Sequence, residues 1–168
     1  MQKRRSIRRF LPTAIPAETL TKILEAANRA PSAGNLQAYH VLVVQDAALK
    51  QRLAAACANQ RSIVEAPVVL VFCTQPDRSA AQFGRAGEEL LCVQDATIAC
   101  AYAQLAATAL GLGSLWIGAR LESETLQDTL TLGEGLWPIA LLPLGHPAEQ
   151  PLDTPRRTLN EMARAVPS

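Results

Sequence analysis

The sequence has few aromatic side chains, few histidines and no closely paired cysteines. Phe, Trp and Tyr make up 4% of the 168 residues, and there are two histidines and four cysteines. Stacking platforms for nucleic-acid bases are therefore scarce. Without a C-x-x-C pair, and with the two histidines far apart, neither a metal site nor a disulfide framework is predicted. We expect reduced thiols in apolar surroundings and, with them, a cytoplasmic protein.

A large net charge and an uninterrupted apolar run are missing as well. The formal net charge is +1, which gives no general attraction to nucleic acid or to an anionic membrane. The most apolar stretch, residues 92–119, contains Gln94, Asp95 and Gln104, so it favours a buried core helix over a membrane span. The basic start leads into no long apolar segment, and no secretory signal is predicted. We expect no nucleic-acid or membrane partner.

The length of 168 residues suits a single domain over 1–168. Apolar positions at helical spacing predict helices over 16–31, 46–58 and about 94–112, the last one ended by Gly111 and Gly113. Further segments predicted from their patterns are strands at 41–44, 68–74, 114–118 and 139–144 and helices at 123–132 and 158–164. Helices and strands alternate unevenly, so the sheet could be parallel, antiparallel or mixed.

The longest predicted helix, residues 94–112, is apolar on every face. Such a helix has to be covered on every side. A domain of this size cannot easily enclose it alone, and we therefore expect a homodimer.

The N-terminal segment concentrates positive charge. Five of the sixteen basic residues fall within seven positions, namely Lys3, Arg4, Arg5, Arg8 and Arg9. One interpretation is a solvated basic tail. The other is a phosphate clamp, because the arginine fork matches phosphate oxygens and Ser6 adds a hydroxyl. Ile7 and Phe10 lie within the run and favour a packed backbone.

A second basic pair, Arg156 and Arg157, lies near the C-terminus. Either it is a surface pair, or it joins the first group around one doubly charged phosphate.

The loop 31–39 carries Asn35 and Gln37, whose amides can both donate and accept hydrogen bonds. This chemistry suits the polar edge of a flavin or nucleobase, and the alternative is that the loop caps itself.

Gly118 follows a predicted buried strand and would let a planar ligand approach the backbone. The glycines at 111–118 end a helix and precede a strand, which is the wrong order for a dinucleotide-binding fold. No serine or cysteine has a neighbouring base.

Together these segments resemble the nitroreductase family of FMN-dependent oxidoreductases. The resemblance extends over almost the whole chain and is carried by four motifs: Arg4-Arg5-Ser6-Ile7-Arg8; Ala30-Pro31-Ser32-Ala33-Gly34-Asn35-Leu36-Gln37; Gln94-Asp95-Ala96 leading to Leu110-Gly111-Leu112-Gly113-Ser114-Leu115-Trp116-Ile117-Gly118; and Pro155-Arg156-Arg157.

The resemblance implies an α+β, nitroreductase-like fold with a central, mostly antiparallel sheet flanked by helices. It also implies an intertwined homodimer with FMN at the interface. Arg4, Arg5, Ser6 and Arg8 would then hold the FMN phosphate and ribityl chain, joined by Arg156 and Arg157. The implied flavin contacts are Ser32, Asn35, Gln37, Ile117 and Gly118.

The implied reaction is ping-pong transfer from NADH or NADPH through flavin N5 to a nitroaromatic, a quinone or a similar small acceptor. No protein catalytic residue is implied. The chain departs from the family pattern in three places. Ala38-Tyr39 stands where Pro-Trp is common, and no acidic residue precedes Gly118. The stretch 75–89 is short compared with members that carry an extra helical segment over the flavin, which leaves the acceptor open. The alternatives are a flavin-modifying relative and a flavin-binding module without reductase activity.

Overall fold

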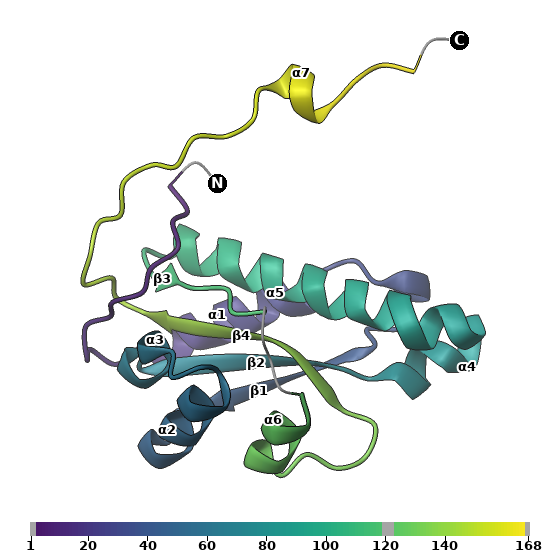
Figure 1. The fold of residues 1–168 in the computed structure, drawn as a ribbon, viewed down its shortest axis with the longest axis horizontal. Helices are drawn as coiled ribbons and strands as arrows, with labels where there is room; N and C mark the ends of the chain where they lie inside the picture. The colour runs from purple at the N-terminus through teal and green to yellow at the C-terminus, as the bar shows by residue number, and fades with distance from the viewer. Residues whose placement is uncertain (1–2, 119–122, 167–168) are drawn as a thin grey trace.

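A four-stranded antiparallel sheet forms the centre of the protein (Figure 1). The computed structural model describes residues 3–118 and 123–166. The strands are β1 (Tyr39–Val44), β2 (Val68–Thr74), β3 (Gly113–Ser114) and β4 (Trp137–Gly145), in the spatial order β1-β2-β4-β3. All three strand pairings are antiparallel. The topology that the sequence pattern left open is therefore settled, and the α+β class is confirmed.

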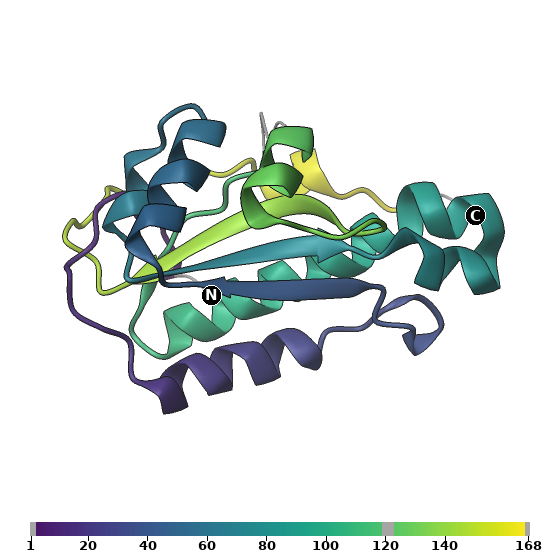
Figure 2. The ribbon, with the colours of Figure 1, turned by 90° about the horizontal axis from the view of Figure 1, so that it is seen from below.

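Helices cover both faces of the sheet (Figure 2). On one face lie α1 (Ala17–Asn28) and α5 (Cys92–Ala109), and on the other lie α2 (Ala47–Ala56), α3 (Arg61–Glu65) and α6 (Ser123–Leu130). Every residue of β2 is buried. Its alternate side chains join two separate apolar clusters, Val69 and Val71 in one and Leu70 and Phe72 in the other. The continuous apolar sequence of β2 follows from this burial on both faces.

The main predicted helices are confirmed, with small differences at their ends. Asp46 caps α2 by accepting a hydrogen bond from the Leu49 amide at 2.7 Å. Gly111 follows α5 with φ +81°, the left-handed conformation expected after a helix. Gly113 instead allows a close approach, because a Cβ there would lie 2.7 Å from Ile7 Cγ1. The terminal helix α7 is shorter than predicted, at Leu159–Met162.

Two helical segments were not predicted from sequence. One is α3, and the other is the pair α4 (Pro76–Ala86) and η2 (Gly87–Leu91), a π-helical turn that leads into α5. Gly84 interrupts α4 with φ +55° and ψ −141°, a conformation essentially restricted to glycine. A Cβ on Gly87 would collide with the Ser79 carbonyl oxygen. The stretch 75–89 therefore folds back on itself as a short helical excursion.

By length and composition alone, the continuous helical stretch Pro76–Ala109 could cross a membrane. Within the fold, however, α5 packs against α1 and against β2 and β4. Its buried residues include Ala96, Ala99, Cys100 and Ala103. The apolar stretch of the sequence is thus the core helix of this domain.

The four cysteines are free and buried. Burial raises the pKa of the Cys57 thiol to about 11 and that of Cys73 to about 12. Burial also raises the pKa of Cys100. Their interpretation as small apolar residues is confirmed, and as un-ionised thiols they are poor nucleophiles.

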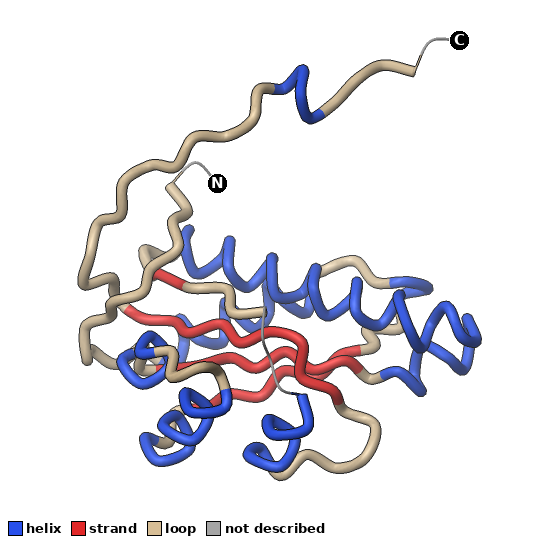
Figure 3. Tube along the Cα trace, viewed as in Figure 1, coloured by secondary structure: helices blue, strands red, loops and turns tan. Residues whose placement is uncertain are grey.

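The N-terminal arm, residues 3–11, runs beside the segment that follows β4. Backbone hydrogen bonds join Leu11 N to His146 O and Ala148 N to Arg9 O, each at 2.9 Å, and Ile7 N to Ser114 O at 2.9 Å. Ile7 and Phe10 are each 6% exposed. Beyond this contact the chain continues as the C-terminal arm, residues 149–166, which is mostly irregular and extends away from the sheet (Figure 3).

Glu65 on α3 anchors the N-terminal arm to the body of the domain. Its carboxylate accepts hydrogen bonds from the Phe10 amide at 3.3 Å and from Arg9 Nε at 3.1 Å, and it also pairs with Arg61. Burial by itself would raise the pKa of Glu65, but these hydrogen bonds outweigh it and lower the pKa. The ionised Glu65 carboxylate is therefore more stable in the folded protein than in the unfolded chain.

This linkage predicts the behaviour of Glu65→Gln in acid. A lowered folded-state pKa stabilises the fold above about pH 4, the ordinary range of a glutamate, and this contribution is lost as the pH falls through the folded-state value. At pH 7 the variant should be less stable than the parent by about 1 kcal/mol. Denaturant unfolding at pH 7 and pH 3 measures the difference, which should shrink at the lower pH. An equal difference at both pH values would contradict the assignment.

Candidate functional site

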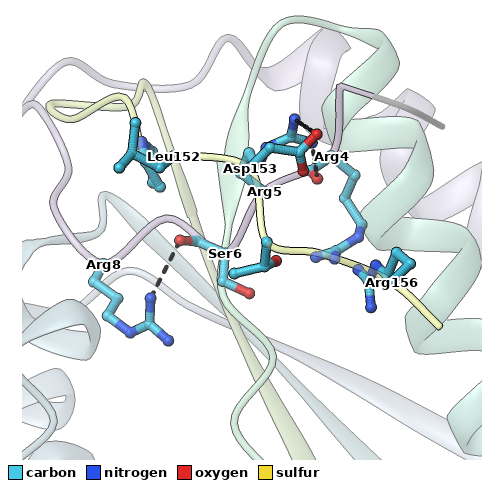
Figure 4. A pocket seen from close by; sticks show the side chains of 9 residues that line it. Arg4, Arg5, Ser6, Arg8, Leu152, Asp153 and Arg156 are labelled. Atoms are coloured by element: carbon cyan, nitrogen blue, oxygen red, sulfur yellow. Dashed lines mark hydrogen bonds and ion pairs between the residues drawn. The ribbon is translucent and has the colours of Figure 1, made fainter.

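A pocket of about 690 Å³ lies between the N-terminal and C-terminal arms (Figure 4). Its lining is rich in guanidinium groups from both ends of the chain: Arg4, Arg5, Ser6, Arg8, Pro151, Leu152, Asp153, Thr154 and Arg156. Residues more than 140 positions apart in sequence thus form one cavity. Arg157, which the sequence places beside Arg156, is exposed and does not line it.

The charges in the pocket are mostly positive and only partly balanced. Among the described residues that line the pocket there is one carboxylate, Asp153; it pairs with Arg5 at 3.1 Å, and its side chain is 78% exposed. Arg8 is exposed, and its Nη1 lies 3.5 Å from the Ser6 carbonyl oxygen. Four arginines facing one carboxylate leave a local positive charge, although the whole chain carries only +1.

The backbone of this arginine segment is held in place by a carboxylate from the opposite arm. Glu149 Oε1 accepts hydrogen bonds from the amides of Arg8 and Arg9. The amide of Ile7, on the inner side of the arm, is bonded to Ser114. The segment is therefore not a freely solvated tail, because its backbone is fixed while the Arg8 guanidinium stays at the surface of the pocket.

The second group of predicted site residues lies on the loop 32–38. This loop includes the short 3-10 turn η1 (Ala33–Asn35). Part of the loop caps itself: the Ser32 hydroxyl accepts from the Gln37 amide at 3.0 Å, and Gln37 Nε2 lies 3.3 Å from the Asn28 carbonyl oxygen. The Asn35 side chain is exposed and makes no hydrogen bond to any residue that the structure describes. Of the two amides singled out by sequence, Asn35 has both its donor and its acceptor free of partners among the described residues, whereas Gln37 uses its Nε2 within the loop.

Ile117 and Gly118 follow β3, at the edge of the described segment. Ile117 pairs with Leu141 through two backbone hydrogen bonds of 2.9 and 2.8 Å. A Cβ on Gly118 would lie 2.8 Å from Trp116 Nε1, so this glycine has a packing role within the chain. Gly118 is also exposed, which leaves its backbone accessible.

The arginine pocket and the loop 32–38 lie at opposite ends of α5. The loop contacts Asp95 in the first turn of the helix, whereas Ser6 and Ile7 pair with Ser114, just beyond its last turn. A helix of this length spans about 25 Å. Within one chain the structure therefore brings together Arg4, Arg5, Ser6, Arg8 and Arg156, and keeps Ser32, Asn35 and Gln37 apart from them.

Four supporting residues have roles that were not identified from sequence, although one of them, Asp95, lies in a motif that carries the family resemblance. They are the carboxylates Glu65, Glu149, Asp95 and Asp153, each of which contacts a predicted site segment. Only their fold-dependent positions reveal this role, since each lies far in sequence from its partner. Among the described residues, no three His, Cys, Asp or Glu side chains lie close enough together to hold a metal ion.

The donor set of the pocket is suited to a phosphate monoester. Guanidinium groups from two directions and a serine hydroxyl can donate to several phosphate oxygens at once. The exposed Asn35 amide at the other end of α5 and the accessible backbone at Gly118 suit a heterocycle with alternating donors and acceptors. A phosphorylated planar cofactor meets both requirements, provided that the two groups of residues are brought together.

Comparison with known proteins agrees with this chemistry. The model of the nitroreductase family matches residues 1–146. An FMN reductase of Bacillus subtilis that uses NAD(P)H is 34% identical over 164 residues, and the match covers 90% of this chain and 66% of the relative. An oxygen-insensitive NADPH nitroreductase of Salmonella typhimurium is 32% identical over 158 residues, with the same coverage of both chains.

A solved structure supports the same assignment. The NADPH:FMN oxidoreductase of Vibrio harveyi, complexed with NAD⁺, superposes with a TM-score of 0.88 and 28% identity over 97% of this chain and 74% of that one. The chain spans about two thirds of the length of the two curated relatives described above. With a family match over most of its length and a shared fold, the chain belongs to the nitroreductase family.

Proposed function

We propose that the protein is an FMN-dependent oxidoreductase that transfers reducing equivalents from NADH or NADPH to a small acceptor, such as a nitroaromatic or a quinone. The observation that carries the proposal is the pocket in which Arg4, Arg5, Ser6, Arg8 and Arg156 converge from both ends of the chain. The relatives whose names include FMN or NADPH give the same chemistry for the family.

The phosphate of FMN would occupy the arginine pocket. A phosphate dianion gains charge-assisted hydrogen bonds from guanidinium groups and from the Ser6 hydroxyl. Asp153 already pairs with Arg5, and its exposed carboxylate would repel the incoming dianion unless it moves aside. Such movement is inexpensive, because an exposed ion pair contributes only about 0–1 kcal/mol.

When bound, FMN supplies the hydride chemistry through its ring. The residues of this chain bind and orient it: the pocket holds the phosphate, Asn35 presents an unpaired amide, and the backbone at Gly118 is accessible. The four cysteine thiols are buried, so they do not compete as nucleophiles. No side chain of the described residues needs to act as a general base for this reaction.

A second copy of the chain would complete the site as an intertwined homodimer. Within one chain the arginine pocket and the loop 32–38 lie about 25 Å apart, at the two ends of α5. A two-fold related copy would bring the loop of one chain to the arginines of the other. Both contributions to the cofactor site would then lie at the subunit interface.

Exposed apolar surface points to the same assembly. On the C-terminal arm Leu152 is 90%, Leu159 76%, Met162 62% and Val166 87% exposed. On α5 the half-exposed Ala101 and Leu105 belong to neither apolar cluster of the described core. Large apolar side chains gathered on one arm are typical of an interaction surface, and a second copy would provide the surface that covers them. We also propose a cytoplasmic location, in keeping with the four free thiols.

The proposal predicts a yellow protein that oxidises NADH or NADPH. Purified protein saturated with FMN should show two flavin absorbance bands, in the near-ultraviolet and the blue, and should turn over either dinucleotide when a quinone or nitroaromatic is added. Flavin binding without dinucleotide oxidation would instead support a binding module. A preparation that takes up no FMN would refute the proposed function.

Removing one guanidinium from the pocket should release FMN without unfolding the protein. Arg8→Ala deletes a charge-assisted phosphate contact, while the Arg8 amide keeps its bond to Glu149. The dissociation constant for FMN should rise at least about tenfold, with a small change in the Tm of the apo-protein. Fluorescence titration and thermal unfolding measure the two quantities.

The matched control is Arg52→Ala, which removes an exposed arginine from α2, on the face of the sheet that lacks α1 and α5. It should leave FMN affinity unchanged. If the two variants weaken FMN binding equally, the pocket is not the phosphate site.

The assembly can be tested by placing a charge on α5. Ala101→Glu introduces a carboxylate on the half-exposed side of the helix. Because burying an unpaired charge is costly, the variant should shift from dimer to monomer in light scattering and lose FMN at the same time. Ala48→Glu, on the exposed side of α2, is the control and should remain dimeric. A flavin-loaded monomer of either the parent or Ala101→Glu would contradict the dimer.

A further inference from the structure

The loop 32–38 is tied to α5 by one buried side chain, Asp95. This residue is 2% exposed. Its Oδ1 accepts a hydrogen bond from the Ala33 amide at 2.9 Å, and its Oδ2 accepts one from the Ala38 amide at 3.4 Å. The two oxygens of one carboxylate thus hold both ends of the loop.

No cation accompanies this buried charge in the part of the chain that the structure describes. Asp95 is absent from every ion pair there. Its neighbours Tyr39 and Cys92 have raised pKa values, first because they are buried and further because Asp95 is negative. A buried carboxylate without a cation is costly unless hydrogen bonds satisfy it. Here the donors are the two loop amides, so the loop and Asp95 stabilise each other.

The loop needs such an anchor because its backbone is strained. Gly34, Asn35 and Gln37 have φ of +57°, +56° and +50°, and the left-handed region is unfavourable for the two residues that are not glycine. On the other side of the loop, Arg78 Nε donates to the Leu36 carbonyl. Phe83 and Gln82 of α4 lie close to Gly34, where a Cβ would be 3.1 Å from the Gln82 amide and 3.2 Å from Phe83 Cζ.

The consequence of this arrangement is the orientation of Asn35. The amides of residues 33 and 38 point inward to Asp95, and the amide of Gln37 is bonded to the Ser32 hydroxyl. The Asn35 side chain, between these fixed points, remains exposed. The loop therefore presents the Asn35 amide in a backbone conformation that its own sequence does not favour.

We propose that Asp95 is a positioning residue for flavin binding. It holds the loop 32–38 in the conformation that presents Asn35 to the flavin ring. The inference rests on the proposed function, in which this loop contacts the flavin. Among the described residues the Asp95 carboxylate accepts hydrogen bonds from the loop backbone alone, so we expect its effect to reach the cofactor through Asn35.

The decisive experiment compares FMN with riboflavin, which has the same ring and no phosphate. Asp95→Asn replaces one acceptor oxygen with an NH₂ group that cannot accept from a loop amide. Loss of this anchor should weaken the binding of FMN and of riboflavin by the same factor, about tenfold or more. Arg8→Ala should weaken FMN binding and leave riboflavin binding nearly unchanged. Fluorescence titration of each flavin against the parent and the two variants of the 168-residue chain provides the six dissociation constants.

The matched control is Asp46→Asn, which alters a carboxylate that also accepts a backbone amide, from Leu49 at the start of α2. Both Asp46→Asn and Asp95→Asn should lower the Tm. Asp46→Asn, however, should leave the affinities for FMN and riboflavin unchanged. Equal flavin binding by Asp95→Asn and the parent would overturn the role of Asp95. Equal weakening of flavin binding by both aspartate variants would also overturn it, since a general loss of stability would then account for the effect.

A second variant keeps the test decisive if Asp95→Asn does not fold. Ala33→Pro removes the amide that Asp95 accepts and leaves the carboxylate in place. Proline is tolerated at the first position of a helical turn, and the preceding Ser32 has φ −141° and ψ 155°, as a residue before proline requires. This variant should weaken the binding of FMN and of riboflavin by a common factor. Unchanged binding of the two flavins would overturn the proposal. If the parent itself binds neither flavin, the proposed function fails first.

Discussion

The contact between the N-terminal arm and the segment after β4 is the constraint on which the arginine pocket depends. Three backbone hydrogen bonds of 2.9 Å hold residues 7–11 against β3 and residues 146–148. Because β4 is the partner of the fully buried β2, the position of this contact is set by the core of the domain. Loss of the contact would separate Arg156 from Arg4, Arg5 and Arg8, and the pocket would lose its concentrated charge.

Buried or half-buried carboxylates perform a common task in this protein. Glu65, Glu149 and Asp95 all accept backbone amides from irregular segments. An arm or loop without secondary structure has amides that need partners, and a carboxylate can satisfy two of them at once. Glu149 in this way fixes the backbone of Arg8 and leaves its guanidinium at the pocket, while Asp95 fixes the loop around Asn35. Negative charge inside the fold thereby orients groups that face a ligand.

Sequence patterns predicted the parts of the protein that are governed by burial. The fully buried β2, the core helix α5, the Asp46 cap and Gly111 follow from apolar periodicity and local backbone preference. The exposed helix α4 buries one residue, Ser79, and so contributes little to the core, although Pro76 and Asp77 are helix-start signals that could have identified it. In the site, arginine clustering and the loop amides were visible in the sequence. The anchoring carboxylates were not, because their partners lie 55 to 141 residues away.

In the proposed homodimer, the placement of the two ligand-facing groups would account for the apolar residues on the uncovered side of α5. The arginine pocket lies beyond the C-terminal end of α5 and the loop 32–38 at its N-terminal end. In an antiparallel pairing of two such helices across a two-fold axis, opposite ends become neighbours. The outward residues Ala101 and Leu105 lie between those ends, where two helices paired in this way would meet. The same apolar surface that a single domain leaves uncovered is thus the surface that would join the two halves of the site.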